Sequence, residues 1–280
     1  MVNYKLCAFA DEADAALDGQ IRAMLDNEIE YLEMRGVNGT NVAKLTSAEA
    51  KSAAAELKAA GIKVWAIGSP AGKTQITDPF DFEQEQFKRL LEIADITGAK
   101  AIRLFSFYGT GGSAEYRDEV MARLSRFVEL AKGSSVLLCH ENEKGIYGED
   151  AAHCLEIHQA IPEIKGVFDP ANFLQARQET IPAWELLEPY VYYGHIKDAN
   201  ENRKVVPPGM GNGQLPVYLK RFFEKGCEVL TLEPHLARFV GLKGLENGDV
   251  TQSATSWSFA SAREAFDFAA NALKSILKEL

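Results

Sequence analysis

Four apolar segments in the second half of the chain each end in side chains that can transfer a proton or bind a cation. They are VLLCHENE (136–143) with Glu141 and Glu143, IKGVFDPANF (164–173) with Asp169 and Asn172, VYYGHIKDA (191–199) with His195 and Lys197, and EVLTLEPHL (228–236) with Glu233 and His235. Short apolar runs of this kind indicate buried strands. The sequence therefore places carboxylates and imidazoles, which serve in acid–base and metal chemistry, at strand ends.

Glu141, Asp169, His195 and Glu233 come from four consecutive predicted strands, so their side chains are expected to lie next to one another. Three carboxylates in one place repel each other, and ionised groups are costly to remove from water without compensation. A divalent cation would relieve both costs. Three oxygen ligands and one imidazole nitrogen, with no thiolate, suit Mn²⁺, our first expectation, and also Mg²⁺, Co²⁺ or Zn²⁺.

The elements that must position these residues alternate along the whole chain. Strand-like runs are predicted at 4–10, 31–37, 63–70 and 101–109 and then at the four segments above, and helices at 17–27, 47–61, 80–98, 113–133, 149–161, 183–189, 215–226 and 258–279. Eight strand–helix units require a parallel sheet and favour its closure into an α/β (β/α)₈ TIM barrel. No Pro-, Gly- or Ser-rich linker divides the 280 residues, so we expect one domain over 1–280.

Side chains alternate between the two faces of a strand, which predicts which residues point toward the barrel axis. The predicted inward sets are Glu141 with Glu143, His195 with Lys197, Glu233 with His235, and Glu33 with Arg35. The polar groups should therefore converge at one end of one cavity.

The order Glu, Asp, His, Glu on successive strands, with His195 in H-I-K-D and Glu233 in L-E-P, resembles the xylose-isomerase-like TIM-barrel superfamily. The resemblance extends over nearly the whole chain. It implies a metal-dependent isomerase or epimerase of a small sugar, sugar phosphate or hydroxy-keto acid. Glu141 and Glu233 would be the acid–base pair on opposite faces of the substrate, with an enediolate between them, and Asp169 and His195 would be metal ligands only.

Five further residues are weaker candidates for substrate binding: Lys197, Asn172, Arg35, His235 and Glu143. Each also has a structural interpretation, such as an ion pair of Lys197 with Asp198 or Glu233, or of Arg35 with Glu33. Asn172 departs from the histidine that the resemblance to ketose epimerases would place there. The glycines of the run 209–213 form either a plain turn or a phosphate-binding loop.

Alternative functions remain open at this point. A lyase of the inosose dehydratase type would use the same metal and the same first proton abstraction, and a non-catalytic carbohydrate-binding barrel would use neither. A nucleic-acid enzyme like endonuclease IV is disfavoured, because the chain has only 5 His and a net charge of −10. The resemblance also admits a homo-oligomer, and the irregular segment 237–257 is either a lid or an oligomer contact.

Composition limits the setting in which the protein works. The N-terminus lacks an uninterrupted apolar segment, and no run approaches the roughly 20 apolar residues of a membrane span. Four scattered cysteines without a C-x-x-C pair predict reduced thiols. We therefore expect a cytoplasmic protein that binds neither membrane nor nucleic acid.

Overall fold

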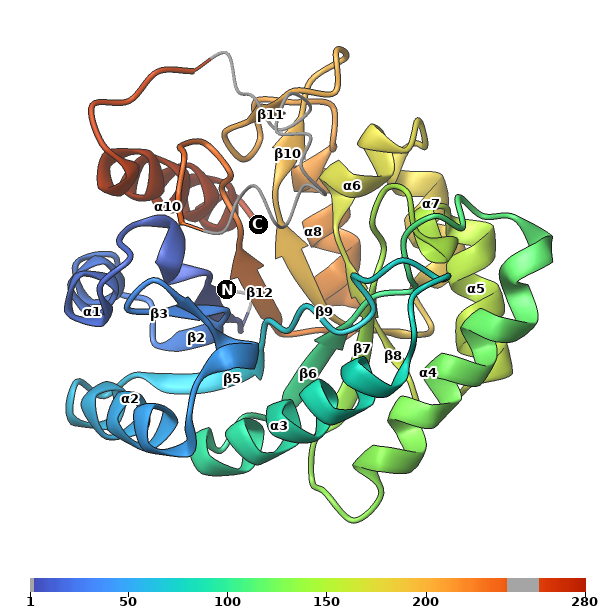
Figure 1. Ribbon diagram of the computed structural model, residues 1–280. Helices are drawn as coiled ribbons and strands as arrows, with labels where there is room; N and C mark the ends of the chain where they lie inside the picture. The colour runs from blue at the N-terminus through green and yellow to red at the C-terminus, as the bar shows by residue number, and fades with distance from the viewer. Residues whose placement is uncertain (1–2, 241–256) are drawn as a thin grey trace.

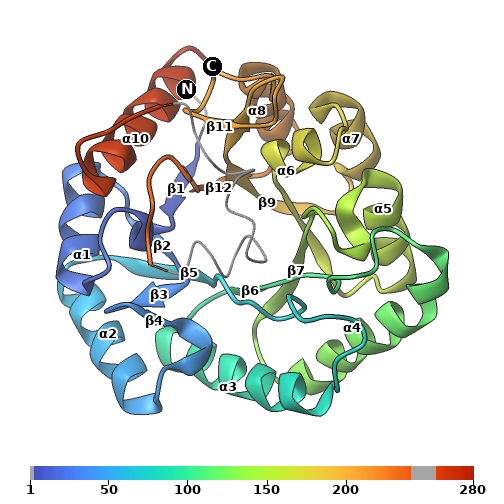
Figure 2. The same ribbon diagram turned by 45° about the horizontal axis from the view of Figure 1, so that its top comes forward.

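The computed structural model describes residues 3–240 and 257–280 and contains a closed barrel of parallel strands inside a ring of helices (Figures 1 and 2). The barrel strands are β1 (Lys5–Ala8), β2 (Tyr31–Met34), β5 (Lys63–Ile67), β6 (Ala101–Leu104), β7 (Leu137–Glu141), β8 (Lys165–Phe168), β9 (Val191–Ile196) and β12 (Val229–Leu232). They pair in chain order, and β1 closes the circle against β12 and β2. The predicted TIM barrel is confirmed. Most of the predicted lid or oligomer contact at 237–257 lies outside the described residues.

The helices that follow the strands form the outer layer. They are α1 (Leu17–Asp26), α2 (Ser47–Ala59), α3 (Asp81–Thr97), α4 (Arg117–Ala131), α5 (Ala151–Ala160), α6 (Pro170–Gln175), α7 (Thr180–Leu187), α8 (Leu215–Glu224) and α10 (Ala262–Lys278). In the part of the chain that the structure describes, none of them has both the length and the apolarity of a membrane span.

Local sequence signals explain where helices begin and end. Thr46 caps α2 in a reciprocal capping box with Glu49, which satisfies two backbone amides at once. Gly98 ends α3 with a φ of 72°, a left-handed conformation that glycine adopts without a steric cost.

The hydrophobic core has two parts. The larger part fills the space between the helices and the outer face of the barrel, with aromatic side chains such as Phe127, Phe168 and Trp184 fully buried there. The smaller part lies inside the barrel and consists of Cys7, Ala66, Ala101, Cys139, Val167, Tyr193 and Val229. Because several of these inner side chains are small, polar groups at the carboxyl end of the strands have room to meet on the barrel axis.

All eight barrel strands end earlier than the sequence suggested. β8 stops at Phe168, because Asp169 accepts a hydrogen bond from the backbone N–H of Asn172 and Pro170 begins α6. Proline suits the first turn of a helix, where its missing N–H costs nothing. β7 ends at Glu141 and β12 at Leu232, so strand alternation does not reach Glu143 or His235, although both side chains are buried.

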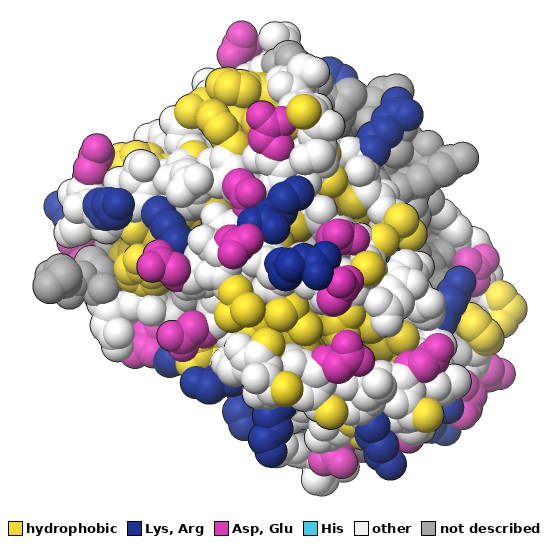
Figure 3. All heavy atoms as spheres, turned by 90° about the vertical axis from the view of Figure 1, so that its left-hand side faces the viewer, with side chains coloured by type: hydrophobic (Ala, Val, Ile, Leu, Met, Phe, Trp, Pro, Cys, Tyr) yellow, Lys and Arg dark blue, Asp and Glu magenta, His cyan; other side chains and the backbone are white. Residues whose placement is uncertain are grey.

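Both signs of charge are interspersed on the face that carries α1, α2 and α10 (Figure 3). Some of these side chains form exposed ion pairs, such as Arg22 with Asp18. The view shows no continuous basic area on that face.

Candidate active site

The four predicted ligand residues meet at the carboxyl end of the barrel. Glu141 is the last residue of β7, Asp169 follows β8, His195 lies in β9 and Glu233 follows β12. One candidate ligand atom from each lies within 4.8 Å of the others, and all four side chains are buried. In the sheet, β8 and β9 separate β7 from β12, so the two glutamates stand at the ends of an arc with Asp169 and His195 between them.

The donor set fits a divalent cation. Asp169 Oδ2 is buried and receives no hydrogen bond among the described residues, although Lys197 Nζ forms an ion pair with it at 2.9 Å. Burial raises the pKa of Asp169 to about 6 despite that lysine, which opposes the rise. A carboxylate that is costly to ionise, beside two further carboxylates and an imidazole, is a suitable ligand for a hard or borderline metal ion.

His195 is held by a residue whose role the sequence did not reveal. Its Nε2 lies 3.1 Å from Glu33 Oε2, and its Nδ1 lies 3.1 Å from Glu141 Oε1 and 3.5 Å from Glu233 Oε2. The Glu33 carboxylate also accepts hydrogen bonds from the hydroxyls of Tyr193 and Thr231, at 3.0 and 2.9 Å. Glu33 therefore fixes the imidazole ring so that Nδ1 faces the other ligands.

The charge state of His195 follows from these neighbours. Burial disfavours the imidazolium, but the adjacent carboxylates of Glu141 and Glu33 outweigh burial and raise the pKa of His195 well above its usual value. Without a metal, His195 is thus protonated, and a cation that binds at Nδ1 has to displace a proton.

Glu141 is held between an arginine and an asparagine. Arg103 Nη1 lies 3.1 Å from its Oε2, and Asn172 Nδ2 donates to its Oε1 at 3.2 Å. Burial would raise the pKa of Glu141, but His195 and Arg103 lower it to about 2. Arg103 was not predicted; its only signal in the sequence is one charged residue between Ile102 and Leu104 of an apolar strand.

Glu233 contacts more cations than the other ligands do. Arg35 donates to its Oε1 and Lys197 to its Oε2, each at 3.1 Å. Burial opposes ionisation, but Lys197 and His235 keep the pKa of Glu233 well below its usual value. Of the two predicted partners of Lys197, the structure confirms Glu233 and not Asp198. The second carboxylate that pairs with Lys197 is that of Asp169.

The remaining predicted residues lie around this cluster. Arg35 pairs with Asp11, at 2.9 Å, and Glu12, at 3.0 Å, in addition to Glu233, so the proposed pair with Glu33 was wrong. His235 Nε2 lies 3.4 Å from Glu12 Oε1 and 3.4 Å from Glu233 Oε1, and its backbone adopts a φ of 49°. Glu143 pairs with Lys73 at 3.1 Å and not with the four ligand residues.

Sequence comparison assigns the chain to a family. Residues 21–260 match the profile of the xylose isomerase-like TIM barrel. The chain belongs to this family. No curated protein matches it.

Solved structures share the fold of this xylose isomerase-like barrel at low sequence identity. D-allulose 3-epimerase from Methylomonas sp., in complex with D-allulose, superposes with a TM-score of 0.75 at 15% identity, covering 100% of this chain and 98% of that one. The probable 3-DHS dehydratase AsbF from Bacillus anthracis gives 0.73 at 14%, covering 97% and 98%. The IOLI protein with a binding zinc atom gives 0.73 at 14%, covering 98% of each chain. These likenesses establish the fold.

The glycine run of this xylose isomerase-like barrel folds around a carboxylate. Asp198 accepts hydrogen bonds from the backbone N–H groups of Gly209, Gly211 and Gly213, at 3.0, 3.0 and 2.9 Å. These amides already have an acceptor. The structure therefore supports the plain turn and not the phosphate-binding loop.

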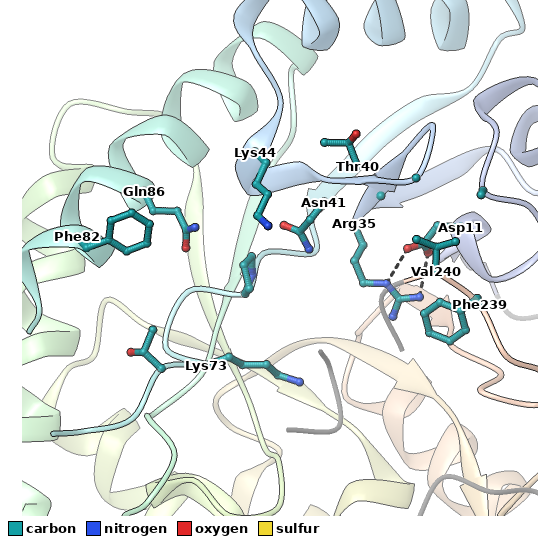
Figure 4. A pocket seen from close by; sticks show the side chains of 15 residues that line it. Asp11, Arg35, Thr40, Asn41, Lys44, Lys73, Phe82, Gln86, Phe239 and Val240 are labelled. Atoms are coloured by element: carbon teal, nitrogen blue, oxygen red, sulfur yellow. Dashed lines mark hydrogen bonds and ion pairs between the residues drawn. The ribbon is translucent and has the colours of Figure 1, made fainter. Parts of the chain in front are cut away.

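A cavity of about 600 Å³ opens beside the ligand cluster. Arg35 and Asp11 form its wall on that side, and Arg35 also contacts Glu233 (Figure 4). The cavity therefore extends from the edge of the cluster into space between the strand-to-helix loops.

Proposed function

We propose that the chain is a divalent-metal-dependent isomerase or epimerase that acts on a small sugar, sugar phosphate or hydroxy-keto acid. The observation that carries this proposal is the arc at the barrel mouth, in which Glu141 and Glu233 flank Asp169 and His195. A substrate held by such an arc would have one carboxylate on each side. The fold shared with D-allulose 3-epimerase and the family of the chain support the same assignment.

Glu141, Asp169, His195 and Glu233 would hold the metal ion. When bound, a divalent cation supplies Lewis acidity, which makes the C–H next to a substrate carbonyl easier to deprotonate. The residues themselves supply proton transfer, orientation and charge compensation.

The two glutamates are suited to accept protons because both are ionised at neutral pH. Arg103 and His195 keep Glu141 deprotonated, and Lys197 and His235 do the same for Glu233. One glutamate would remove the proton next to the carbonyl, which leaves an enediolate. Return of that proton to a neighbouring carbon gives an isomer. For an epimer, the other glutamate would first take up a proton from solvent and then deliver it to the opposite face.

Charged neighbours would also stabilise the negative charge that develops on the substrate. Lys197 Nζ and Arg103 Nη1 each lie within 3.1 Å of a ligand carboxylate and are fixed there by burial. Fixed cations in a site that excludes water stabilise a developing anion without reorganisation.

The test is proton exchange in D₂O. Metal-stripped protein is reloaded with Mn²⁺, incubated with ketoses, ketose phosphates, hydroxypyruvate and inosose, and the products are examined by NMR after the Mn²⁺ is removed. We expect deuterium next to the carbonyl together with an isomerised or epimerised product. Glu141→Gln and Glu233→Gln should abolish this exchange, whereas Asp169→Asn should mainly weaken metal binding.

Glu83→Gln is the matched control, because Glu83 is a buried carboxylate outside the cluster that accepts hydrogen bonds from Gly72 and Thr74. It should keep the exchange. Full activity in either the Glu141 or the Glu233 variant would exclude the paired-glutamate mechanism. No exchange with any compound, and no effect of a chelator, would favour the non-catalytic carbohydrate-binding barrel.

A second candidate function is a lyase of the inosose dehydratase type. His235 favours it, because this imidazole lies 3.4 Å from Glu233 Oε1 and could protonate a departing hydroxyl after the first proton abstraction. The shared fold with a probable 3-DHS dehydratase points the same way. Loss of water in the D₂O experiment, in place of an isomerised product, would assign the lyase.

A further inference from the structure

The cavity beside the cluster is chemically asymmetric. At its inner end the guanidinium of Arg35 is neutralised by Asp11 through two hydrogen bonds of 2.9 Å. At its outer end Lys44 and Lys73 point into the same space from two different walls (Figure 4). Lys44 ends the short helix η2 (Val42–Lys44), and Lys73 lies in the loop after β5.

The outer end has an excess of positive charge. Asp11 is the only acidic residue that lines the described cavity, and it is committed to Arg35. No carboxylate of the described residues forms an ion pair with Lys44, whereas Glu143 pairs with Lys73 at 3.1 Å. This local excess occurs in a chain whose net charge is −10, so general composition does not explain it.

Neighbouring contacts hold the donors in place. Lys73 Nζ lies 4.3 Å above the ring of Phe105 and in contact with Glu143, so its ammonium is anchored at the cavity wall. Asn41 Oδ1 accepts a hydrogen bond from the backbone N–H of Ala43 and lies on the side of Lys44, and the amide NH₂ of Asn41 points into the open cavity (Figure 4). Two ammonium groups and an amide donor form a suitable environment for anionic oxygens.

We propose that the outer end of this cavity is an anionic subsite, in which Lys44, Lys73 and Asn41 bind a phosphate or carboxylate group of the substrate. The inference rests on the proposed function, because it assumes that the other end of the same substrate reaches the cluster next to Arg35. Phe82 lines the cavity beyond Lys44 and Phe239 packs against Arg35, so an apolar side chain borders each end (Figure 4). The preferred substrates are therefore phosphorylated sugars or sugar acids, and not neutral sugars.

The decisive variant is Lys44→Gln. Lys44 is exposed and has no ion-pair partner among the described residues, so its replacement should leave the fold intact. Lys51→Gln is the control, because Lys51 is an exposed lysine of α2 outside the cavity and its loss changes the net charge equally. The probes are inorganic phosphate, D-ribulose 5-phosphate with D-ribulose, and a keto sugar acid, titrated calorimetrically into the protein and also tested for exchange in D₂O.

We expect Lys44→Gln to weaken binding of the phosphate ester about tenfold, as for loss of one charge-assisted hydrogen bond. The Lys51→Gln variant should bind the phosphate ester as tightly as the unmodified protein does. Binding of D-ribulose should be the same in both variants as in the unmodified protein. The same loss seen with the sugar acid alone would assign a carboxylate as the natural group. Anion binding that Lys44→Gln leaves unchanged, or no binding of any anion, would overturn the subsite.

The subsite and the proposed function can fail separately. Lys44-dependent binding of the anions without any deuterium exchange would retain the subsite and reject the isomerase. Exchange with neutral ketoses that is as fast as with their phosphates, and is unaffected by Lys44→Gln, would retain the isomerase and reject the subsite.

Discussion

Glu33→Gln isolates the residue that orients His195. The substitution keeps the size of the side chain but removes its charge and one of its acceptor oxygens. Glu33 now accepts from the hydroxyls of Tyr193 and Thr231 and contacts His195 Nε2, all between 2.9 and 3.1 Å. Glutamine has one carbonyl oxygen, so it cannot accept from all three groups as the carboxylate does, and it offers the imidazole a neutral acceptor in place of a charged one.

At high pH, where no proton competes for His195, we expect the variant to bind the metal about 10- to 100-fold more weakly, or by about 1.4 to 2.7 kcal/mol. This loss is typical when a partner of a metal-binding histidine is removed. A second effect has the opposite sign. The carboxylates of Glu141 and Glu33 raise the pKa of His195 well above its usual value. Below that pKa a metal competes with a proton, and affinity falls by up to about tenfold for each pH unit.

Removing the charge of Glu33 lowers the pKa of His195, so the pH at which affinity begins to fall should shift downward in the variant. The assay is titration with Mn²⁺ between pH 6 and pH 9, followed by electron paramagnetic resonance. We expect the Mn²⁺ affinity of the variant to be lower than that of the unmodified protein at high pH, and to fall less steeply as the pH is lowered toward 6. Thermal unfolding checks the fold, and Glu83→Gln should reproduce the unmodified profile. An unchanged affinity at high pH and an unchanged pH profile in a folded Glu33→Gln protein would refute the orienting role.

Two further predictions concern stability. Asp198→Asn should lower the free energy of unfolding by about 1 to 3 kcal/mol, since three glycine amides lose a charged acceptor, and chemical denaturation would measure it; an unchanged midpoint would contradict the role given to Asp198. Burial lowers the pKa of His158 to about 4, so the unfolded chain binds a proton there that the folded chain does not. Stability should therefore be complete above about pH 6.5 and fall toward pH 4, by at most about 1.4 kcal/mol per pH unit from this residue. Denaturation curves at several pH values should show that His158→Phe reduces this slope, and an equal slope would argue against it.

The sequence was most informative where polar residues interrupt buried strands. Glu141, Asp169, His195 and Glu233 could be grouped because each follows an apolar run, and parallel strands bring their carboxyl ends together. The strand boundaries were less predictable. A capping aspartate followed by proline ended β8 within a segment that read as continuous strand, and alternation could not place residues beyond such an end.

The sequence could not predict which charged side chains form ion pairs with each other, because each charged group in the barrel has several candidate partners of opposite sign. Glu33 lies inside β2 and Arg35 one residue past its end; both face the cluster as predicted, but their neighbours come from across the barrel. Glu33 contacts His195 of β9, and Arg35 contacts Glu233 after β12. These pairings depend on barrel closure and on side-chain length, which no local pattern contains.

The charge balance of the cluster explains how one fold can exist with and without a metal ion. Arg103, Lys197 and protonated His195 compensate the buried carboxylates when no cation is present, so the site does not need a metal to avoid three unpaired charges. Binding at Nδ1 releases the proton of His195, so a dication adds about one net charge to the site instead of two. Because the arginine and lysine remain, the loaded site keeps positive charge for an anionic intermediate. Proton release on Mn²⁺ binding, measured in buffers of different ionisation enthalpy, should therefore approach one per site at neutral pH, and the absence of any release would show that His195 is already neutral.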